Sequence, residues 1–304
     1  MEQVARVGDR DQPVARHEGG RELSAHGDVT VATDHDDLAW FESFQRLRFG
    51  HRMKRMCWTR TYRGAMNAGP DRMYFRQLLS GRDFAVDDPL AGQMVNFVYA
   101  IGDRDTGECV LVDPAYAVED LLGVLEADGM RLTGVLATHY HPDHIGGSMM
   151  GHTIEGVPAL LERVECPVHV QTAETPWVSR VIDIPERDLA AHAPGDVVKV
   201  GEIEIELLHT PGHTPGSQCL LVNGRLISGD TLFLDGCGRT DLPGSDAALM
   251  YDSLQHLAVL PPGTVVYPGH RYSAPSSATM GSVVEQNYVF KPSSKDQWMT
   301  MFGR

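Results

Sequence analysis

The densest chemical signal in the sequence is a run of imidazole and carboxylate side chains at His139, His141, Asp143 and His144. It follows the apolar stretch 132–137, which predicts a buried strand, so the four side chains lie on the loop at the carboxyl end of that strand. Neutral imidazole and carboxylate are ligands that suit zinc, iron or manganese. The spacing therefore predicts a metal site rather than isolated core or surface histidines.

Three more ligand-type residues also follow predicted strands. His213 comes after the alternating segment 203–208, in a stretch where two Pro-Gly pairs force turns. Asp230 follows the second strand of a hairpin whose turn is an Asn-Gly pair, and His270 follows the last predicted strand. Because each strand end delivers one ligand-type side chain, we predict that all of them gather around one centre.

The elements that carry these residues begin near position 73, and from there to about 289 predicted strands and helices interleave without repeats. We expect one α/β catalytic domain over residues 67–304 and an N-terminal extension over residues 1–66 that is disordered or partly helical. Residues 44–66 are basic and partly apolar. One interpretation is an arm that binds a membrane surface or a partner. The other is a solvated linker helix or a translated stretch ahead of the true start.

The motifs, in this order, resemble those of the metallo-β-lactamase superfamily, and the resemblance covers nearly all of the chain from 73 to 289. It implies a four-layer αββα sandwich with a two-metal site at one edge. It also implies a role for each ligand-type residue. By the resemblance, His139, His141 and His213 bind the first metal, and Asp143, His144 and His270 bind the second. Asp230 bridges the two metals, and Asp113 supports the loop as a hydrogen-bond acceptor.

Two cations roughly 3.5 to 4 Å apart lower the pKa of a shared water from 15.7 to about 7, so that hydroxide forms at neutral pH. We therefore predict a hydrolase that attacks a carbonyl with a metal-bridging hydroxide. Its cofactors are two divalent ions, zinc first, with iron or manganese as alternatives. Asp143 and Asp230 are the predicted catalytic residues. Asp143 fits a metal ligand better than a general base, although a shared duty stays open.

Segment 236–241 resembles the Gly-Cys-Gly-basic segment of glyoxalase II, the hydroxyacylglutathione hydrolases, and of the related persulfide dioxygenases. By that resemblance Arg239 and Tyr272 occupy the positions that grip the peptide of a thiol carrier. The alternatives are an ion pair of Arg239 with Asp241 or Asp246 and ordinary loop packing of Tyr272. The predicted substrate is thus a small-molecule thioester.

The alternative reaction is that of a mononuclear iron persulfide dioxygenase. Its iron would be held by one histidine of the first motif together with His213 and Asp230. The complete second ligand set favours two metals and hydrolysis. Because only 34 residues follow His270, where glyoxalase II carries a helical domain, the thiol carrier stays open. A binding protein with a dead site is a third hypothesis, which the complete ligand set disfavours.

Composition sets wider limits. The chain has 304 residues, of which 42% are hydrophobic, so it can bury a sizeable core. A formal net charge of −15 argues against a sequence-independent nucleic-acid binder. No apolar run approaches the roughly 20 residues of a membrane span, and no signal-peptide core is present, so we expect a cytoplasmic protein. Its five unclustered cysteines indicate neither a disulfide framework nor a thiolate zinc site, and nothing indicates an oligomeric state.

Overall fold

The computed structural model describes residues 72–303, and the predicted extension 1–66 lies outside that range. The first of two six-stranded sheets has the order β1-β2-β3-β4-β7-β8, in which β1, β2 and β3 are antiparallel and β3, β4, β7 and β8 are parallel. Its strands are β1 (Met73–Leu79), β2 (Phe97–Asp103), β3 (Glu108–Val112), β4 (Arg131–Leu136), β7 (Val168–Gln171) and β8 (Ala190–His192).

The second sheet has the order β14-β13-β12-β11-β10-β9, and within it only β12 and β13 are parallel. Its strands are β9 (Val197–Val200), β10 (Ile203–His209), β11 (Gln218–Val222), β12 (Arg225–Gly229), β13 (Val265–Pro268) and β14 (Ala278–Thr279). A separate short hairpin joins β5 (Gly147–Met149) to β6 (His152–Ile154).

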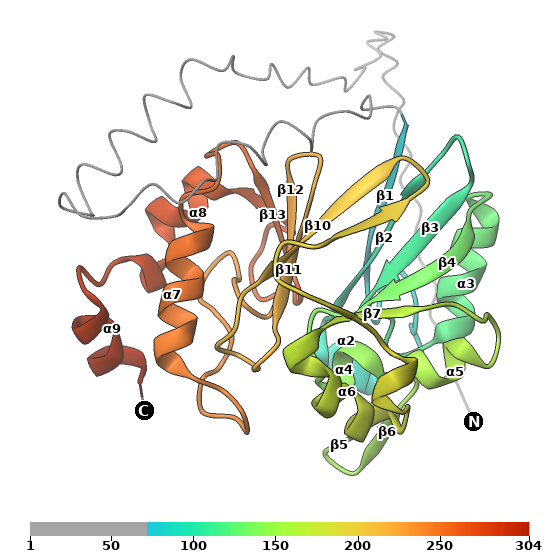
Figure 1. The fold of residues 1–304 in the computed structure, drawn as a ribbon, viewed down its shortest axis with the longest axis horizontal. Coiled ribbons are helices and arrows are strands. Elements are labelled where there is room, and N and C mark those ends of the chain that lie inside the picture. Colours follow the sequence, from blue (N-terminus) through green and yellow to red (C-terminus); the bar gives the residue numbers. More distant parts are fainter. Residues whose placement is uncertain (1–71, 304) are drawn as a thin grey trace, which may run out of the picture. The chain divides into compact units, whose positions relative to one another are not determined.

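Helices flank both sheets (Figure 1). Between β1 and β8 the chain forms α2 (Pro89–Met94), α3 (Val118–Ala127), α4 (Pro142–Ile145), α5 (Val157–Leu161) and α6 (Thr175–Ile182), with the 3-10 turns η1 (Thr172–Glu174) and η2 (Glu186–Asp188). Those beside the second sheet are α7 (Ala247–Leu257), α8 (Met280–Gln286) and α9 (Lys295–Phe302), with η3 (Tyr288–Phe290).

Three apolar clusters hold these layers together. The central cluster joins the two sheets and includes Leu136 of the first sheet and Ile205 of the second. A second cluster packs α3, α5 and α6 against the outer face of the first sheet, and a third packs α7, α8 and α9 against the second sheet. Side chains alternate along each strand, so one strand supplies both faces of its sheet. The predicted αββα layering is confirmed.

The predicted hairpin is also confirmed. β11 and β12 pair antiparallel with Val222 opposite Arg225. Both turn residues have positive φ, 43° at Asn223 and 72° at Gly224, as the tight primed turn of a two-residue hairpin requires. Likewise, β10 buries Ile203, Ile205 and Leu207, while Glu204 is exposed and Glu206 is half-buried.

One predicted strand begins too early. The apolar run 94–101 predicts a strand from Met94, whereas α2 ends at Met94 and β2 starts only at Phe97. Asp88 caps α2 by accepting from Leu90 N and Ala91 N, and Pro89 opens it. The capping residues at the start of α2 therefore keep Met94 in the helix, although the apolar run favours a strand there.

Candidate metal centre

Five loops supply the ligand-type side chains, and each follows a strand (Figure 1). The loops after β3 and β4 come from the first sheet, and those after β10, β12 and β13 from the second. Parallel strands end at the same edge, so β3 with β4, and β12 with β13, direct their loops to one side. The seven residues predicted as ligands, His139, His141, Asp143, His144, His213, Asp230 and His270, are all brought together there.

Three imidazoles form the first donor set. His141 Nδ1 lies 3.0 Å from His139 Nε2 and 3.0 Å from His213 Nε2. The other ring nitrogen of His139 contacts Thr138 Oγ1 at 3.0 Å, and that of His213 contacts the Arg239 carbonyl at 2.8 Å. The convergent nitrogens of His139 and His213 are therefore left to face a shared point, which is the geometry of a histidine metal site.

Two imidazoles and a carboxylate form the second set. His144 Nε2 lies 3.2 Å from His270 Nε2. Asp143 Oδ2 lies 3.6 Å from the first of these nitrogens and 3.4 Å from the second. The outer nitrogen of His270 contacts the Met94 carbonyl at 2.8 Å. These residues thus converge as the first set does.

Asp230 lies between the two sets. Its Oδ2 is 3.8 Å from His213 Nε2 and 3.3 Å from His270 Nε2, while its Oδ1 is 3.5 Å from His144 Nε2. Within residues 72–303, buried Oδ1 has no hydrogen-bond donor. Such an oxygen is costly to bury unless a cation or a donor satisfies it. The donor set therefore fits divalent metal ions, with Asp230 shared between two positions.

The electrostatics differ between the two sets. Burial and the neighbouring imidazoles lower the pKa of His139 and bring that of His141 to about 4, so these rings are neutral, which is the form that binds metal. Burial also lowers the pKa of His213. For His144, burial acts downward, yet the carboxylates of Asp143 and Asp230 outweigh it and raise the pKa to about 10. His144 of the second set thus lies in more negative surroundings than His141 of the first.

Asp113 supports the loop, as the resemblance implies. Its carboxylate accepts from Thr138 N at 2.7 Å and from Thr138 Oγ1 at 2.6 Å, and it lies 2.9 Å from His144 Nδ1. Its backbone φ of 54° is in the left-handed region. Because the carboxylate occupies Nδ1, the opposite nitrogen of His144 faces the site.

The sequence profile of the metallo-beta-lactamase superfamily matches residues 91–270, which contain every ligand of both sets. The chain belongs to this superfamily. It is a family of metal-dependent hydrolases that bind divalent metals, and its fold is the sandwich described above.

Three relatives illustrate the range of the superfamily. The chain is 30% identical to a probable polyketide biosynthesis zinc-dependent hydrolase, BaeB, of Bacillus velezensis, over 69% of this chain and 88% of that protein. It is 34% identical to a hydroxyacylglutathione hydrolase of Rhodospirillum rubrum, over 60% of this chain and 64% of that protein. Among solved structures it resembles ETHE1 from Myxococcus xanthus with a TM-score of 0.61 and 29% identity, over 76% of this chain and 90% of that one.

Asn96 contacts the second donor set, and no motif in the sequence predicts this. Its amide Nδ2 donates to Asp143 Oδ2 at 3.1 Å, and Tyr116 OH donates to its Oδ1 at 3.3 Å. Asn96 is only 2% exposed. The one hint in the sequence is that Asn96 is a polar residue inside the apolar run 94–101. The reversal at Val95, with φ of 50°, turns the side chain inward, and local sequence does not reveal that.

The two predicted substrate residues lie at the rim. Arg239 forms a two-pronged ion pair with Asp241, at 2.9 Å for both contacts, and its side chain is 69% exposed. This is one of the alternatives that the sequence left open. Tyr272 is 56% exposed and stacks on the His270 ring, with centroids 4.7 Å apart and planes 6° from parallel. Tyr272 therefore touches a candidate ligand directly, and Arg239 does so only through its backbone carbonyl.

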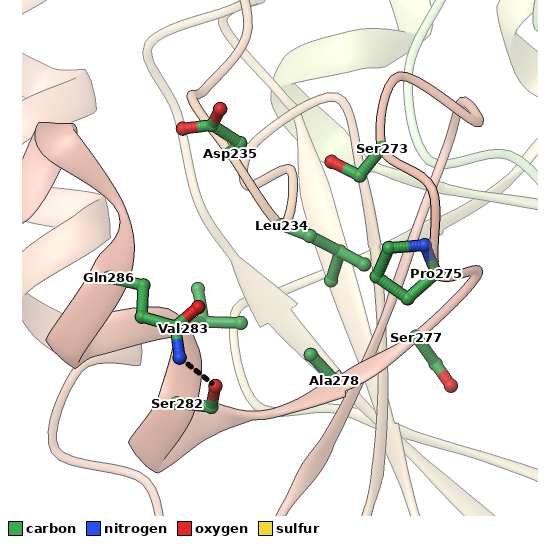
Figure 2. A pocket seen from close by; sticks show the side chains of 9 residues that line it. All are labelled: Leu234, Asp235, Ser273, Pro275, Ser277, Ala278, Ser282, Val283 and Gln286. Carbon is green, nitrogen blue, oxygen red and sulfur yellow. Dashed lines mark hydrogen bonds between the residues drawn. The ribbon is translucent and has the colours of Figure 1, made fainter.

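A hollow of about 460 Å³ adjoins the loops that follow Asp230 and His270. Figure 2 shows Leu234 and Val283 at its apolar wall, with the Asp235 carboxylate and serine hydroxyls around them. The remaining lining comes from the 273–278 loop and from α8. The hollow mixes apolar surface with hydrogen-bonding groups, and none of the seven candidate ligands is among its lining residues.

No helix within residues 72–303 is long and apolar enough to cross a membrane.

Proposed function

We propose that this protein hydrolyses the thioester of a small thiol carrier. The observation that carries the proposal is the complete second donor set, Asp143, His144 and His270, beside the three-histidine set. We assign the sets to two divalent metals, zinc first and iron or manganese as alternatives, with Asp230 as the shared ligand. The likeness to a hydroxyacylglutathione hydrolase supports thioesters as the substrate class.

Bound divalent cations would supply a water that ionises near neutral pH and a Lewis acid for the developing oxyanion. The chain supplies orientation. Asp113 holds His144 through Nδ1, and the carbonyls of Arg239 and Met94 hold His213 and His270 in the same way. Hydrogen bonds of this kind fix the ring orientation and tautomer.

The substrate would be held at the rim of this site. Tyr272 offers its exposed ring and hydroxyl beside His270, and the adjoining hollow has room for the unreactive part of a small thioester. Arg239 would reach a carboxylate of the carrier by exchanging its partner Asp241. Asp143, whose Oδ2 already accepts from Asn96, acts in this proposal as a ligand rather than as a general base.

The resemblance of segment 236–241 to persulfide dioxygenases favours a second candidate, in which one iron is bound and O₂ is consumed. One histidine of the first motif, His213 and Asp230 would hold it. Three protein ligands of this kind leave open positions for persulfide and O₂.

One experiment separates the two candidates. Purified protein is analysed for metal content, and thioester hydrolysis is then measured with and without oxygen. Two metals per chain and turnover of a hydroxyacyl thioester without O₂ are expected. One iron per chain, oxygen uptake with a persulfide and no anaerobic hydrolysis would replace the hydrolase by the dioxygenase.

A further inference from the structure

Glu174 is a buried carboxylate that none of the proposed ligand roles uses. It ends η1, directly before α6, and is 1% exposed. Its Oε1 accepts from Tyr140 N at 2.8 Å, and its Oε2 accepts from Gly216 N at 2.6 Å. The Thr214 side chain, whose hydroxyl lies 2.7 Å from Ser217 Oγ, acts to lower the pKa of the same carboxylate against the larger upward effect of burial. The two oxygens are therefore held by two different loops.

These are the two loops that carry the first donor set. Tyr140 lies between His139 and His141, and Thr214 follows His213. We propose that Glu174 is a positioning residue that fixes the distance between these loops, and hence the three-histidine geometry. The inference rests on the metal assignment proposed above and not on the choice between hydrolase and dioxygenase.

Both loops fit closely around Glu174. A Cβ at Gly216 would lie 2.4 Å from the backbone nitrogen of Glu174 and 2.7 Å from its Oε2, so only glycine allows this approach. On the other side, the Tyr140 ring stacks on Trp177 of α6 with centroids 5.0 Å apart. The Tyr140 hydroxyl donates to the Pro243 carbonyl at 2.8 Å. Movement of Glu174 would therefore be transmitted to both loops.

The carboxylate accepts from two backbone N–H groups, those of Tyr140 and Gly216. Across residues 72–303 no cationic side chain pairs with Glu174, and burial raises its pKa to about 7. A glutamine in its place would keep the shape but have only one oxygen. Its NH₂ group would then face either Tyr140 N–H or Gly216 N–H, donor against donor. Glutamine therefore releases one loop and keeps the other.

The second donor set has supports other than Glu174. Asp143 and His144 lie on α4, and His270 follows β13. Asn96 and Asp113 support that set from the other side. Loss of the Glu174 contact should thus weaken one metal position and spare the other.

The test titrates the full chain, freed of metal, with Co²⁺, and follows binding by equilibrium dialysis and by visible absorption. Wild type is expected to bind two equivalents. In Glu174→Gln one equivalent should bind about 10- to 100-fold more weakly, as for other groups that orient metal ligands, while the other stays within about threefold. Glu186→Gln is the matched control, because Glu186 accepts from Thr175 Oγ1 on α6 and touches neither loop.

The outcomes separate the two proposals. Wild type that binds no metal contradicts the proposed function. If wild type binds two equivalents and Glu174→Gln binds both with unchanged affinity, the inference about Glu174 is wrong while the proposed function stands. A lower melting temperature of the variant would not change this conclusion, because it would indicate a purely structural residue. If Glu174→Gln does not fold, Glu174→Asp, whose shorter side chain cannot reach both backbone N–H groups, replaces it with the same expected direction and the same overturning result.

Discussion

At the scale of single residues, the site is shaped by groups that are not ligands. His144, His213 and His270 each have one ring nitrogen occupied by an acceptor: the Asp113 carboxylate, the Arg239 carbonyl and the Met94 carbonyl. The free nitrogen of each ring is left to face the centre. A ring held in this way loses little conformational freedom on binding a metal. Two of the three acceptors are backbone carbonyls, and no sequence motif predicts such contacts.

Asp230→Asn tests the shared carboxylate. The amide keeps the volume but loses the charge, and we expect at least one metal equivalent to be lost and thioester hydrolysis to fall by 100-fold or more. The far-ultraviolet circular dichroism should be unchanged, because Asp230 caps no helix. Metal analysis and kcat/KM check this expectation. Two metals and activity within twofold of wild type would contradict the assignment of Asp230 as the shared ligand.

A pair of variants tests Arg239. If its guanidinium binds the carrier, Arg239→Ala raises KM severalfold with little change in kcat. Asp241→Ala removes the partner at 2.9 Å, so the freed guanidinium should lower KM. Steady-state kinetics measure both. Equal KM values in the two variants and in wild type would leave Arg239 only its exposed ion pair with Asp241.

At the scale of elements, strand ends position the site. β3 and β4 are parallel, as are β12 and β13, so the loops that carry Asp113, His139, Asp230 and His270 leave their sheets in matching directions. The strands themselves can be predicted from apolar patterns in the sequence. The helix α2 cannot be predicted in this way, because its last turn reaches an apolar run that also fits a strand.

The parallel pair β7 and β8 carries a pH-sensitive contact. His169 Nδ1 lies 2.9 Å from His192 Nε2, and burial lowers the pKa of His169 to about 4. The folded state thus keeps this ring neutral, while the unfolded chain takes up a proton below about pH 6.5. Stability from this group is complete above pH 6.5 and is lost as the pH falls toward 4.

His169→Gln should therefore reduce the acid sensitivity of the fold. Between pH 7 and pH 4 we expect the free energy of unfolding of wild type to fall by about 1 to 3 kcal/mol more than that of the variant. Urea unfolding at several pH values measures the difference. The control is His256→Gln, an exposed position on α7, which should follow wild type. Parallel pH profiles for wild type and His169→Gln would contradict the expectation.

At the scale of the whole molecule, the described residues form a layered core around the candidate site. All three apolar clusters and both donor sets are built from residues 72–303. The extension 1–66 was predicted as a separate region, and that assignment stays a prediction.

Deletion of residues 1–66 tests it. The shortened chain should keep the metal content, the melting temperature and the hydrolytic kcat/KM of the full chain, because no described layer is removed. Metal analysis, calorimetry and the thioester assay supply the three measurements. Insoluble or unfolded protein after the deletion would show that the extension is integral to the domain.

The sequence by itself determined the ligand types, their order along the chain and the strands that precede them. Periodicity and turn chemistry are local, so the hairpin at Asn223 and the half-buried strand β10 could be predicted from neighbouring residues. Only the tertiary structure decided which distant groups meet: Asn96 with Asp143, and Glu174 with both loops of the first donor set. Such contacts join residues more than thirty positions apart, and they depend on how the sheets and helices pack.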